Sequence, residues 1–224
     1  MPAPLLFIPI ILSLTACDRD EAAAPIPPAV ETEEEKQLYA LGQAVARQFV
    51  LPGLFEEDEM AIVSVGFKDA VARRDTLVNF DAQVDPMNAM LTARRAVKNL
   101  QWGIEFREMA ATWPGAITTD SGLIFQSVEK GTGASPTADD TVAAHFNGKF
   151  VDGRMFDSSA DEGVANFALN QVMPGWTEAF QMMKAGGKAR FVVPPHLAHG
   201  EQGKAPTIPP NATLIFEVEL LAIQ

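Results

Sequence analysis

The segment HFNGKFVDGRMFDSS, residues 145–159, holds the residues whose types and order best suit a chemical role. Phe156 and Asp157 place a carboxylate beside an aromatic face, and two hydroxyl residues follow directly. A carboxylate beside apolar surface loses hydration, so it needs a hydrogen-bond partner or a task. Asp157 is therefore a candidate functional group, and a structural acceptor that fixes the local backbone is the alternative.

Three histidines, His145, His196 and His199, raise the question of a metal site. They fall on a predicted strand and a loop, without cysteines or the ligand spacing that is typical of zinc sites. We therefore expect no metal, and no residue pattern calls for a cofactor.

Two short strands joined by Asp152-Gly153 are expected to position the Phe156-Asp157 pair. Asp-Gly between strand-like runs favours a tight hairpin, because both central turn residues need positive φ and glycine adopts it without steric cost. The hairpin would carry the carboxylate on its second strand.

Length and charge limit the function classes. The 224 residues are enough for one large domain or two small ones, and the formal net charge is -12 without any Lys/Arg cluster. Nucleic acid and anionic membrane surfaces are therefore excluded as partners, since they require a basic patch.

The N-terminus resembles a bacterial lipoprotein signal peptide, residues 1–17. An apolar run at 5–16 is interrupted by Pro9 and too short to span a bilayer, and Leu-Thr-Ala-Cys then matches the processing box that ends at Cys17. Cys17 would carry the lipid, and a buried N-terminal helix with a core cysteine is the alternative. Residues 18–30, rich in Ala and Pro, are expected to form a flexible tether in the bacterial cell envelope, on the periplasmic side of a membrane.

Residues 31–113 are predicted to form an all-helical domain, because apolar residues recur at helical spacing with charged residues between them. Pro52-Gly53 ends the first helix, and the acidic run 56–59 suits the positive end of a second. A third helix is expected to begin at Asp85-Pro86, a capping residue followed by proline at the first helical position, and to reach Thr112. The stripe of the first helix comprises Leu38, Leu41, Val45 and Phe49.

Three helices give a thin core for about 80 residues. We expect the two shorter helices, within residues 31–75, to pair with those of a second chain and form a homodimer. A self-contained helical bundle is the alternative.

Residues 114–224 change from helical to alternating periodicity after Trp113-Pro114-Gly115. One short helix is expected at 175–183 among several strands, which predicts an α+β domain with a bent antiparallel sheet wrapped around that helix. The predicted strands are 123–129, 141–150, 154–157, 165–169, 188–193 and 214–223.

Three separated motifs carry a family resemblance: HFNGKFVDGRMFDSS, NQVMPGWTEAFQMMKAGGKARFVVPPHLAHG and IPPNATLIFEVELL. Together they make residues 118–224 similar to an FKBP-type peptidyl-prolyl cis-trans isomerase. The YALG motif at 39–42 and the GFKDA motif at 66–70 resemble the dimerisation domain of the periplasmic, macrophage infectivity potentiator type. The resemblance implies proline-containing polypeptides as substrates, and binding of FK506- or rapamycin-like macrolides.

The resemblance also implies a pocket. Trp176 would be the floor under the proline ring, the Met173 N–H would donate to a substrate carbonyl, and Asp157 would face the pocket as a catalytic group. Two positions depart from the family, since Phe146 and His199 stand where tyrosines are usual. Phe146 removes a hydroxyl expected to hold Asp157, and His199 would be a hydrogen-bonding group at the rim. The implied apolar walls are Phe156, Val172, Met173, Ile208 and Phe216.

Two functions remain open from the sequence. The first is an isomerase that assists folding of envelope proteins by stabilising the twisted amide in an apolar pocket, without a nucleophile or metal. The second is an envelope chaperone or binding module with weak or no isomerase activity. Phe146 and His199, which stand where the family usually has tyrosine, keep this second function open.

Overall fold

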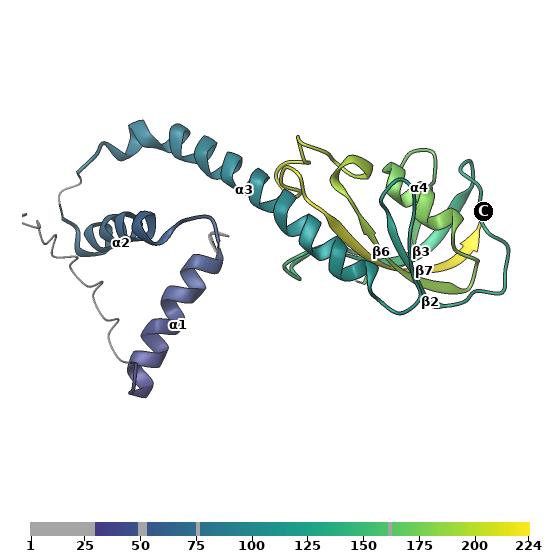
Figure 1. The fold of residues 1–224 in the computed structure, drawn as a ribbon, viewed down its shortest axis with the longest axis horizontal. Coiled ribbons are helices and arrows are strands. Elements are labelled where there is room, and N and C mark those ends of the chain that lie inside the picture. Colours follow the sequence, from purple (N-terminus) through teal and green to yellow (C-terminus); the bar gives the residue numbers. More distant parts are fainter. Residues whose placement is uncertain (1–29, 49–52, 75–76, 161–162) are drawn as a thin grey trace, which may run out of the picture. The chain divides into compact units, whose positions relative to one another are not determined.

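The structure is a computed structural model that describes residues 30–48, 53–74, 77–160 and 163–224 (Figure 1). The chain divides into two compact units, residues 1–50 and 51–224, and each is described by itself. The predicted signal peptide, Cys17 and the tether up to residue 29 lie outside the described residues. None of the described helices is long and apolar enough to span a bilayer.

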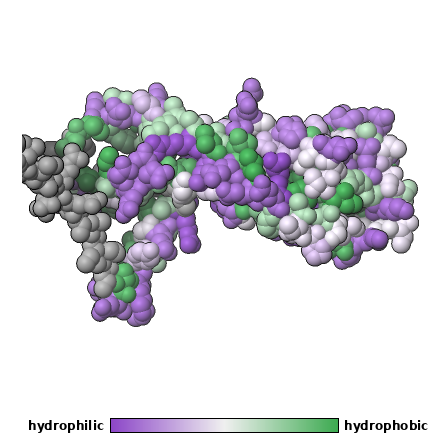
Figure 2. All heavy atoms as spheres, in the orientation of Figure 1, coloured by the Kyte–Doolittle hydropathy of each residue, from purple (hydrophilic) through white to green (hydrophobic). Residues whose placement is uncertain are grey.

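Helix α1, Glu33–Gln48, belongs to the first unit. Its start is fixed by a reciprocal pair of bonds: the Glu35 carboxylate accepts from the Thr32 N–H at 2.8 Å, and the Thr32 hydroxyl accepts from the Glu35 N–H at 3.2 Å. Leu38 and Leu41 of the predicted stripe are 62% and 61% exposed, and no described residue of α1 is buried. Figure 2 shows hydrophobic residues at the surface of this helix. Its apolar stripe is therefore uncovered within the described part of the unit.

Helix α2, Glu57–Ala72, begins at the predicted acidic run. Its N-cap Glu56 takes part in a capping box with Glu59, and the helix ends at Arg73 in the left-handed conformation, with φ 51°. No described residue of α2 is buried, and Phe67 is 56% exposed. The apolar side chains of the second helix are thus also uncovered in the described residues.

Helix α3, Phe80–Ala111, starts earlier than expected. The predicted start at Asp85-Pro86 is wrong, because Asn79 caps the helix by accepting from the Ala82 N–H at 3.2 Å. Pro86 lies inside the helix, where it removes one backbone hydrogen bond. That loss near the helix start is outweighed by the cap and by the long run of helix-forming residues that follows.

Arg94 joins α3 to the start of α2. Its guanidinium donates to the two carboxylate oxygens of Glu59 at 2.7 and 2.5 Å, donates to the Leu54 carbonyl at 3.2 Å, and lies 5.2 Å from the centre of the Phe55 ring. Hydrogen bonds from Arg94 lower the pKa of Glu59 from 4.5 to about 2. The fork-to-fork geometry fixes both the distance and the orientation of α2 against α3.

The second unit contains one antiparallel sheet of seven strands in the described residues, in the order β1-β2-β6-β7-β3-β4, with β5 paired to β3. Six strands match the predicted ranges to within one residue at each end. The three-residue β1 was not predicted, because so short a strand carries no alternation. The strands are β1 Ala116–Thr118, β2 Ile124–Glu129, β3 Thr141–Phe150, β4 Met155–Ser158, β5 Ala165–Ala168, β6 Gly187–Val193 and β7 Leu214–Ile223.

Helix α4, Pro174–Gln181, packs against one face of this sheet (Figure 1). Trp176, Ala179 and Phe180 of α4 are buried against side chains of β3, β6 and β7. A β-carbon at Gly175 would collide with Val193, so glycine lets the helix approach the sheet closely. The predicted α+β fold, with a sheet wrapped on one short helix, is confirmed. A 3-10 turn at Pro195–Leu197 precedes the loop to β7.

The C-terminal end of α3 covers part of the opposite face of the sheet. Ala110 is fully buried against Ile124, Val192 and Ile215. The Arg190 guanidinium, also on this face, lies 3.5 Å from the centre of the Trp113 ring. Both faces of the sheet are thus covered, one by α4 and the other in part by α3.

The middle of α3 is tied to the segment Pro209–Thr213, which leads into β7. The Asn99 side chain donates to the Pro210 carbonyl at 2.9 Å, and the Asn211 side chain donates to the Ala96 carbonyl at 3.3 Å. Asn211 has φ 56°, a left-handed conformation that asparagine tolerates. Gly103 of α3 faces the Thr213 side chain, where no β-carbon would fit.

The β3–β4 hairpin differs in its turn from the prediction. Gly153 has φ 84°, but Asp152 is not among the residues with positive φ, so the turn is not the two-residue type expected. The Phe150 carbonyl accepts from the Gly153 N–H and the Phe150 N–H donates to the Arg154 carbonyl, which closes a three-residue loop. The Asp152 carboxylate also accepts from the Arg154 N–H at 3.0 Å, which adds a side-chain bond within the loop.

We expect the bond between Glu59 and Arg94 to make the docking of α2 on α3 dependent on pH. Because the folded pKa of Glu59 lies below its ordinary value, the stabilisation is complete above about pH 4.5 and is lost as pH falls toward 2. Glu59→Gln should therefore lower the free energy of unfolding at pH 7, and its difference from wild type should shrink below pH 4.5. Chemical denaturation followed across this pH range measures the difference.

The control is Glu57→Gln, which removes an acidic residue from the same first turn of α2, where no ion pair to Glu57 occurs among the described residues. An equal loss in both variants, or a Glu59→Gln difference that does not change with pH, would contradict the assignment.

Candidate functional site

A cavity of about 490 Å³ opens beside the start of α4. Its volume lies in the range of about 300 to 1,000 Å³ that is usual for small-ligand sites. All nine pocket residues proposed from the sequence line it, together with four that were not proposed. The nine are Phe146, Phe156, Asp157, Val172, Met173, Trp176, His199, Ile208 and Phe216, and the four are Phe167, Gln171, Lys204 and Thr207.

Trp176 lies in the first turn of α4 and forms part of the cavity wall while remaining 3% exposed. Its indole ring meets the rings of Phe146, Phe167 and Phe216 edge-on, with centroid distances of 5.3, 4.7 and 5.0 Å. The indole N–H has no hydrogen-bond partner among the described residues. An indole held on three sides by other rings is a rigid apolar platform.

Met173 is the N-cap of α4, and its carbonyl accepts from the N–H groups of Trp176 and Thr177. The N–H groups at the start of a helix have no intrahelical acceptor, so the Met173 N–H belongs to a set of donors at the positive end of the helix. This arrangement suits the donation to a substrate carbonyl that the sequence implies.

Phe156 of β4 reaches the cavity across the hairpin. It packs against Phe150 at 4.9 Å and edge-on against Phe216 at 5.7 Å between ring centroids. A β-carbon at Gly148, on the paired strand β3, would lie 2.7 Å from the tip of the Phe156 ring. Glycine at this position leaves the space that the aromatic wall fills.

Asp157 is exposed and lines the mouth of the same cavity. Its Oδ1 accepts from the Ser158 N–H at 2.9 Å, which is a bond within the strand end and not a bond from the partner strand. The carboxylate therefore finds its donor in the neighbouring peptide group and its hydration in solvent. This hydrogen bond does not depend on a hydroxyl at position 146.

Phe146 is buried and faces Trp176 and Phe167, both edge-on. Its backbone, not its side chain, makes the polar contact here, because the Phe146 N–H donates to the buried Ser159 hydroxyl at 2.9 Å. The ring at this position thus contributes apolar wall. Phe146 can therefore influence catalysis only by packing against the other aromatic rings of the cavity.

His199 lies on the loop after the 3-10 turn, half-buried at the cavity edge. Burial, followed by the nearby positive charge of Lys204, holds the pKa of His199 below its usual 6.5. The imidazole is therefore neutral at neutral pH and offers one nitrogen as donor and the other as acceptor.

Sequence reasoning missed four lining residues for different reasons. Phe167 lies on a predicted strand, and the alternation of β5 could have indicated which of its side chains face the core. Gln171, Lys204 and Thr207 lie in loops, where no periodic pattern reports on orientation.

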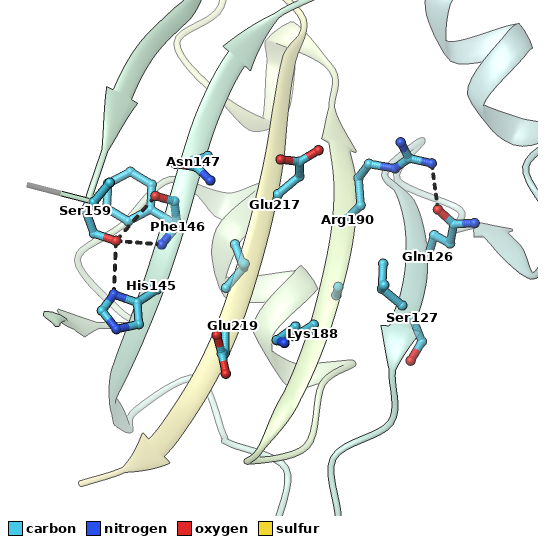
Figure 3. A pocket seen from close by; sticks show the side chains of 14 residues that line it. Gln126, Ser127, His145, Phe146, Asn147, Ser159, Lys188, Arg190, Glu217 and Glu219 are labelled. Carbon is cyan, nitrogen blue, oxygen red and sulfur yellow. Dashed lines mark hydrogen bonds between the residues drawn. The ribbon is translucent and has the colours of Figure 1, made fainter. Parts of the chain in front are cut away.

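An open groove of about 850 Å³ lies on the face of the sheet that α3 covers in part (Figure 3). Acidic and basic residues are paired across it in register, Glu217 with Arg190 and Glu219 with Lys188. His145 points to the Ser159 hydroxyl, with its Nδ1 3.4 Å from the Ser159 Oγ. Compensated charges of this kind are typical of a solvated sheet face.

Metal-ligating residues do not gather in the described part of the chain, where no group of three or more His, Cys, Asp or Glu side chains could hold an ion. The chemistry available at the cavity is thus that of apolar walls, fixed donors and one carboxylate.

Comparison with known proteins gives two family matches. A family model described as FKBP-type peptidyl-prolyl cis-trans isomerase matches residues 133–221. A second, described as the domain amino terminal to FKBP-type peptidyl-prolyl isomerase, matches residues 34–126. The matches together cover the helical region and the sheet domain that holds the cavity.

Relatives extend over nearly the whole chain. The FKBP-type peptidyl-prolyl cis-trans isomerase FkpA of Aeromonas hydrophila is 36% identical over 251 residues, covering 98% of this chain and 93% of the relative. The outer membrane protein MIP of Legionella longbeachae is 30% identical and covers 88% of each chain. The crystal structure of FkpA from Escherichia coli superposes with a TM-score of 0.61 at 35% identity, covering 88% of this chain and 99% of that chain. The resemblance seen in the motifs is confirmed, and the chain belongs to the FKBP-type peptidyl-prolyl cis-trans isomerases.

Proposed function

We propose that this isomerase acts on X-Pro bonds of unfolded envelope proteins at the 490 Å³ cavity, as a lipid-anchored dimer on the periplasmic side of a bacterial membrane. Its enzyme class and its action on proline-containing polypeptides follow from the family. The location of the site, the anchor, the dimer and the division at residue 113 are our proposals. The observation that carries the site assignment is that nine residues chosen from separated motifs line one cavity.

The proposed mechanism needs no covalent step. Rotation about an X-Pro bond must cross about 18 to 20 kcal/mol because it destroys amide resonance. The twisted amide is less conjugated and less dependent on solvation, so a dry aromatic site favours it over the planar form. Trp176 would hold the proline ring, and the Met173 N–H would bond the substrate carbonyl. Lowering the barrier by about 3 to 4 kcal/mol gives a hundred-fold acceleration or more.

Asp157 would assist electrostatically, from the mouth of the cavity. Its exposure at the mouth of the cavity and its bond from the Ser158 N–H support a carboxylate that is held in place and remains accessible to the substrate. The alternative is a structural acceptor that fixes the end of β4. The apolar walls would also accept macrolides of the FK506 and rapamycin type, which present a ring and carbonyl groups to such a pocket.

The N-terminal part would attach the protein to a membrane and pair it with a second chain. The exposed apolar residues of α1 and α2 support an association of these helices with those of a second chain. The name of one relative, outer membrane protein MIP, supports a place in the envelope. Lipidation at Cys17 would supply the anchor, and residues 18–30 the distance from the membrane.

A second function, holding unfolded chains as a chaperone, is favoured by one observation. Phe67 and Ile62 on α2 and Leu38 on α1 are each more than half exposed, on helices without a buried residue in the described part. Such faces bind apolar segments of unfolded polypeptides as readily as a second copy of the helices. The two activities are compatible, since they use different parts of the chain.

Asp157→Ala is expected to lower kcat/KM for a proline-containing peptide about tenfold, because one electrostatic contact to the rotating amide is lost. A protease-coupled isomerisation assay measures this value. Asp139→Ala, which removes an exposed carboxylate outside the cavity, is the control and should match wild type. An unchanged rate for Asp157→Ala would assign that residue to the structure of the hairpin, whereas wild-type catalysis no faster than the spontaneous reaction would refute the mechanism.

The dimer hypothesis predicts twice the monomer mass at micromolar concentration in sedimentation equilibrium. Leu38→Glu with Leu41→Glu should give a monomer, because two charges would be buried in the interface, and peptide isomerisation should remain. Gln37→Glu with Gln43→Glu adds the same charge to α1 at polar positions and serves as the control. A monomeric wild type contradicts the hypothesis. Loss of aggregation suppression in the leucine variant alone would support the chaperone function.

Lipidation predicts that the wild-type protein, expressed in bacteria, is recovered with membranes and labelled by radioactive palmitate. Cys17→Ala should be unlabelled and should move to the soluble fraction. A labelled or membrane-bound Cys17→Ala variant would show that another feature holds the protein at the membrane.

A further inference from the structure

Lys204 contributes a positive charge to the wall of the cavity that neither the mechanism nor the family resemblance uses. Its backbone is held by two hydrogen bonds of 2.8 Å, from the Lys204 N–H to the Ile208 carbonyl and from the Ile208 N–H to the Lys204 carbonyl. Ile208 is itself a buried wall residue of the cavity. The backbone of Lys204 is thus fixed at the rim of the cavity, while the residue as a whole is exposed.

Lys204 has no acidic partner among the described residues, whereas three other basic residues of the same unit do. Lys149 pairs with Glu217 at 2.8 Å, Lys188 with Glu129 at 3.2 Å, and Arg154 with Asp152 at 2.8 Å. No ion pair among the described residues includes Lys204. A cation that no carboxylate of the described chain compensates is available to a carboxylate of a ligand.

Among the polar groups at the rim of the cavity, Lys204 is the one that carries a positive charge at neutral pH. His199 is neutral at neutral pH, since burial and the Lys204 charge hold its pKa below 6.5. Asp157, the carboxylate that lines the cavity, comes from β4, whereas Lys204 comes from the loop before β7. The rim therefore offers one negative and one positive group, carried by separate elements. A peptide with its proline in the cavity would meet both.

We propose that Lys204 is a specificity-determining residue that favours substrates with an acidic side chain directly beside the proline. The proposal rests on the assignment of this cavity to the proline ring. A Glu or Asp side chain next to the proline would form an ion pair with the ammonium group at the rim, so it would raise affinity without entering the apolar floor. Because Lys204 is exposed, the preference should be modest, about two- to fivefold in kcat/KM at low ionic strength.

The test compares peptides that differ in one residue. Two pairs are needed, Glu against Gln directly before the proline and Glu against Gln directly after it, because the direction of the bound chain is left open. Rates are measured for wild type, for Lys204→Gln, and for Lys184→Gln. Lys184 is an exposed lysine that does not line the cavity, so the control variant has the same net charge as Lys204→Gln.

We expect wild type and Lys184→Gln to favour Glu over Gln in at least one pair, and Lys204→Gln to lose the difference between the Glu and Gln peptides. The preference should also fade at about 1 M salt, where the Debye length is about 3 Å. Equal rates for Glu and Gln in both pairs, or a preference that survives in Lys204→Gln or disappears equally in Lys184→Gln, would overturn it. Absence of catalysis on the Gln peptides would instead count against the proposed function of the cavity.

Discussion

The packing of Trp176 against the sheet is the constraint on which the rest of the isomerase domain depends. The indole lies close to four phenylalanine rings, and this requires a helix that is capped by Met173 and touches the sheet through Gly175. The bend of the strands, the position of α4 and the cavity are three aspects of one arrangement. A residue that is both core and cavity wall cannot be altered for one purpose without changing the other.

Phenylalanine at 146, where the family resemblance implies tyrosine, is consistent with this arrangement. The Phe146 ring completes the aromatic cluster, and Asp157 takes its hydrogen bond from Ser158 and its hydration from solvent. The carboxylate and the aromatic wall are therefore less coupled than in a pocket where a hydroxyl bridges them. The polar groups at the mouth of the cavity come from two parts of the chain, Asp157 from β4 and His199 and Lys204 from the connection before β7.

Much of this could be predicted from sequence, and the failures have physical causes. Long strands such as Thr141–Phe150 were located because alternation over ten residues is unambiguous. The start of α3 was misplaced because Asp85-Pro86 imitates a helix start, while the cap at Asn79 is a single local bond. The cavity walls were found through motifs, whereas Lys204 was missed because the orientation of a loop side chain depends on contacts distant in the sequence, such as the pairing with Ile208.

The attachment of α3 near Gly103 makes the helix a mechanical lever. From Gly103 to Phe80 the helix extends for about 35 Å, so each degree of rotation at the attachment moves the far end by roughly 0.6 Å. The pivot is stiff, because Asn99 and Asn211 bond across it and Gly103 leaves no free space. Those bonds also reach the Pro209–Thr213 segment, one residue from Ile208 in the cavity wall. A load on the far end of α3 would thus reach the segment that adjoins Ile208 in the cavity wall.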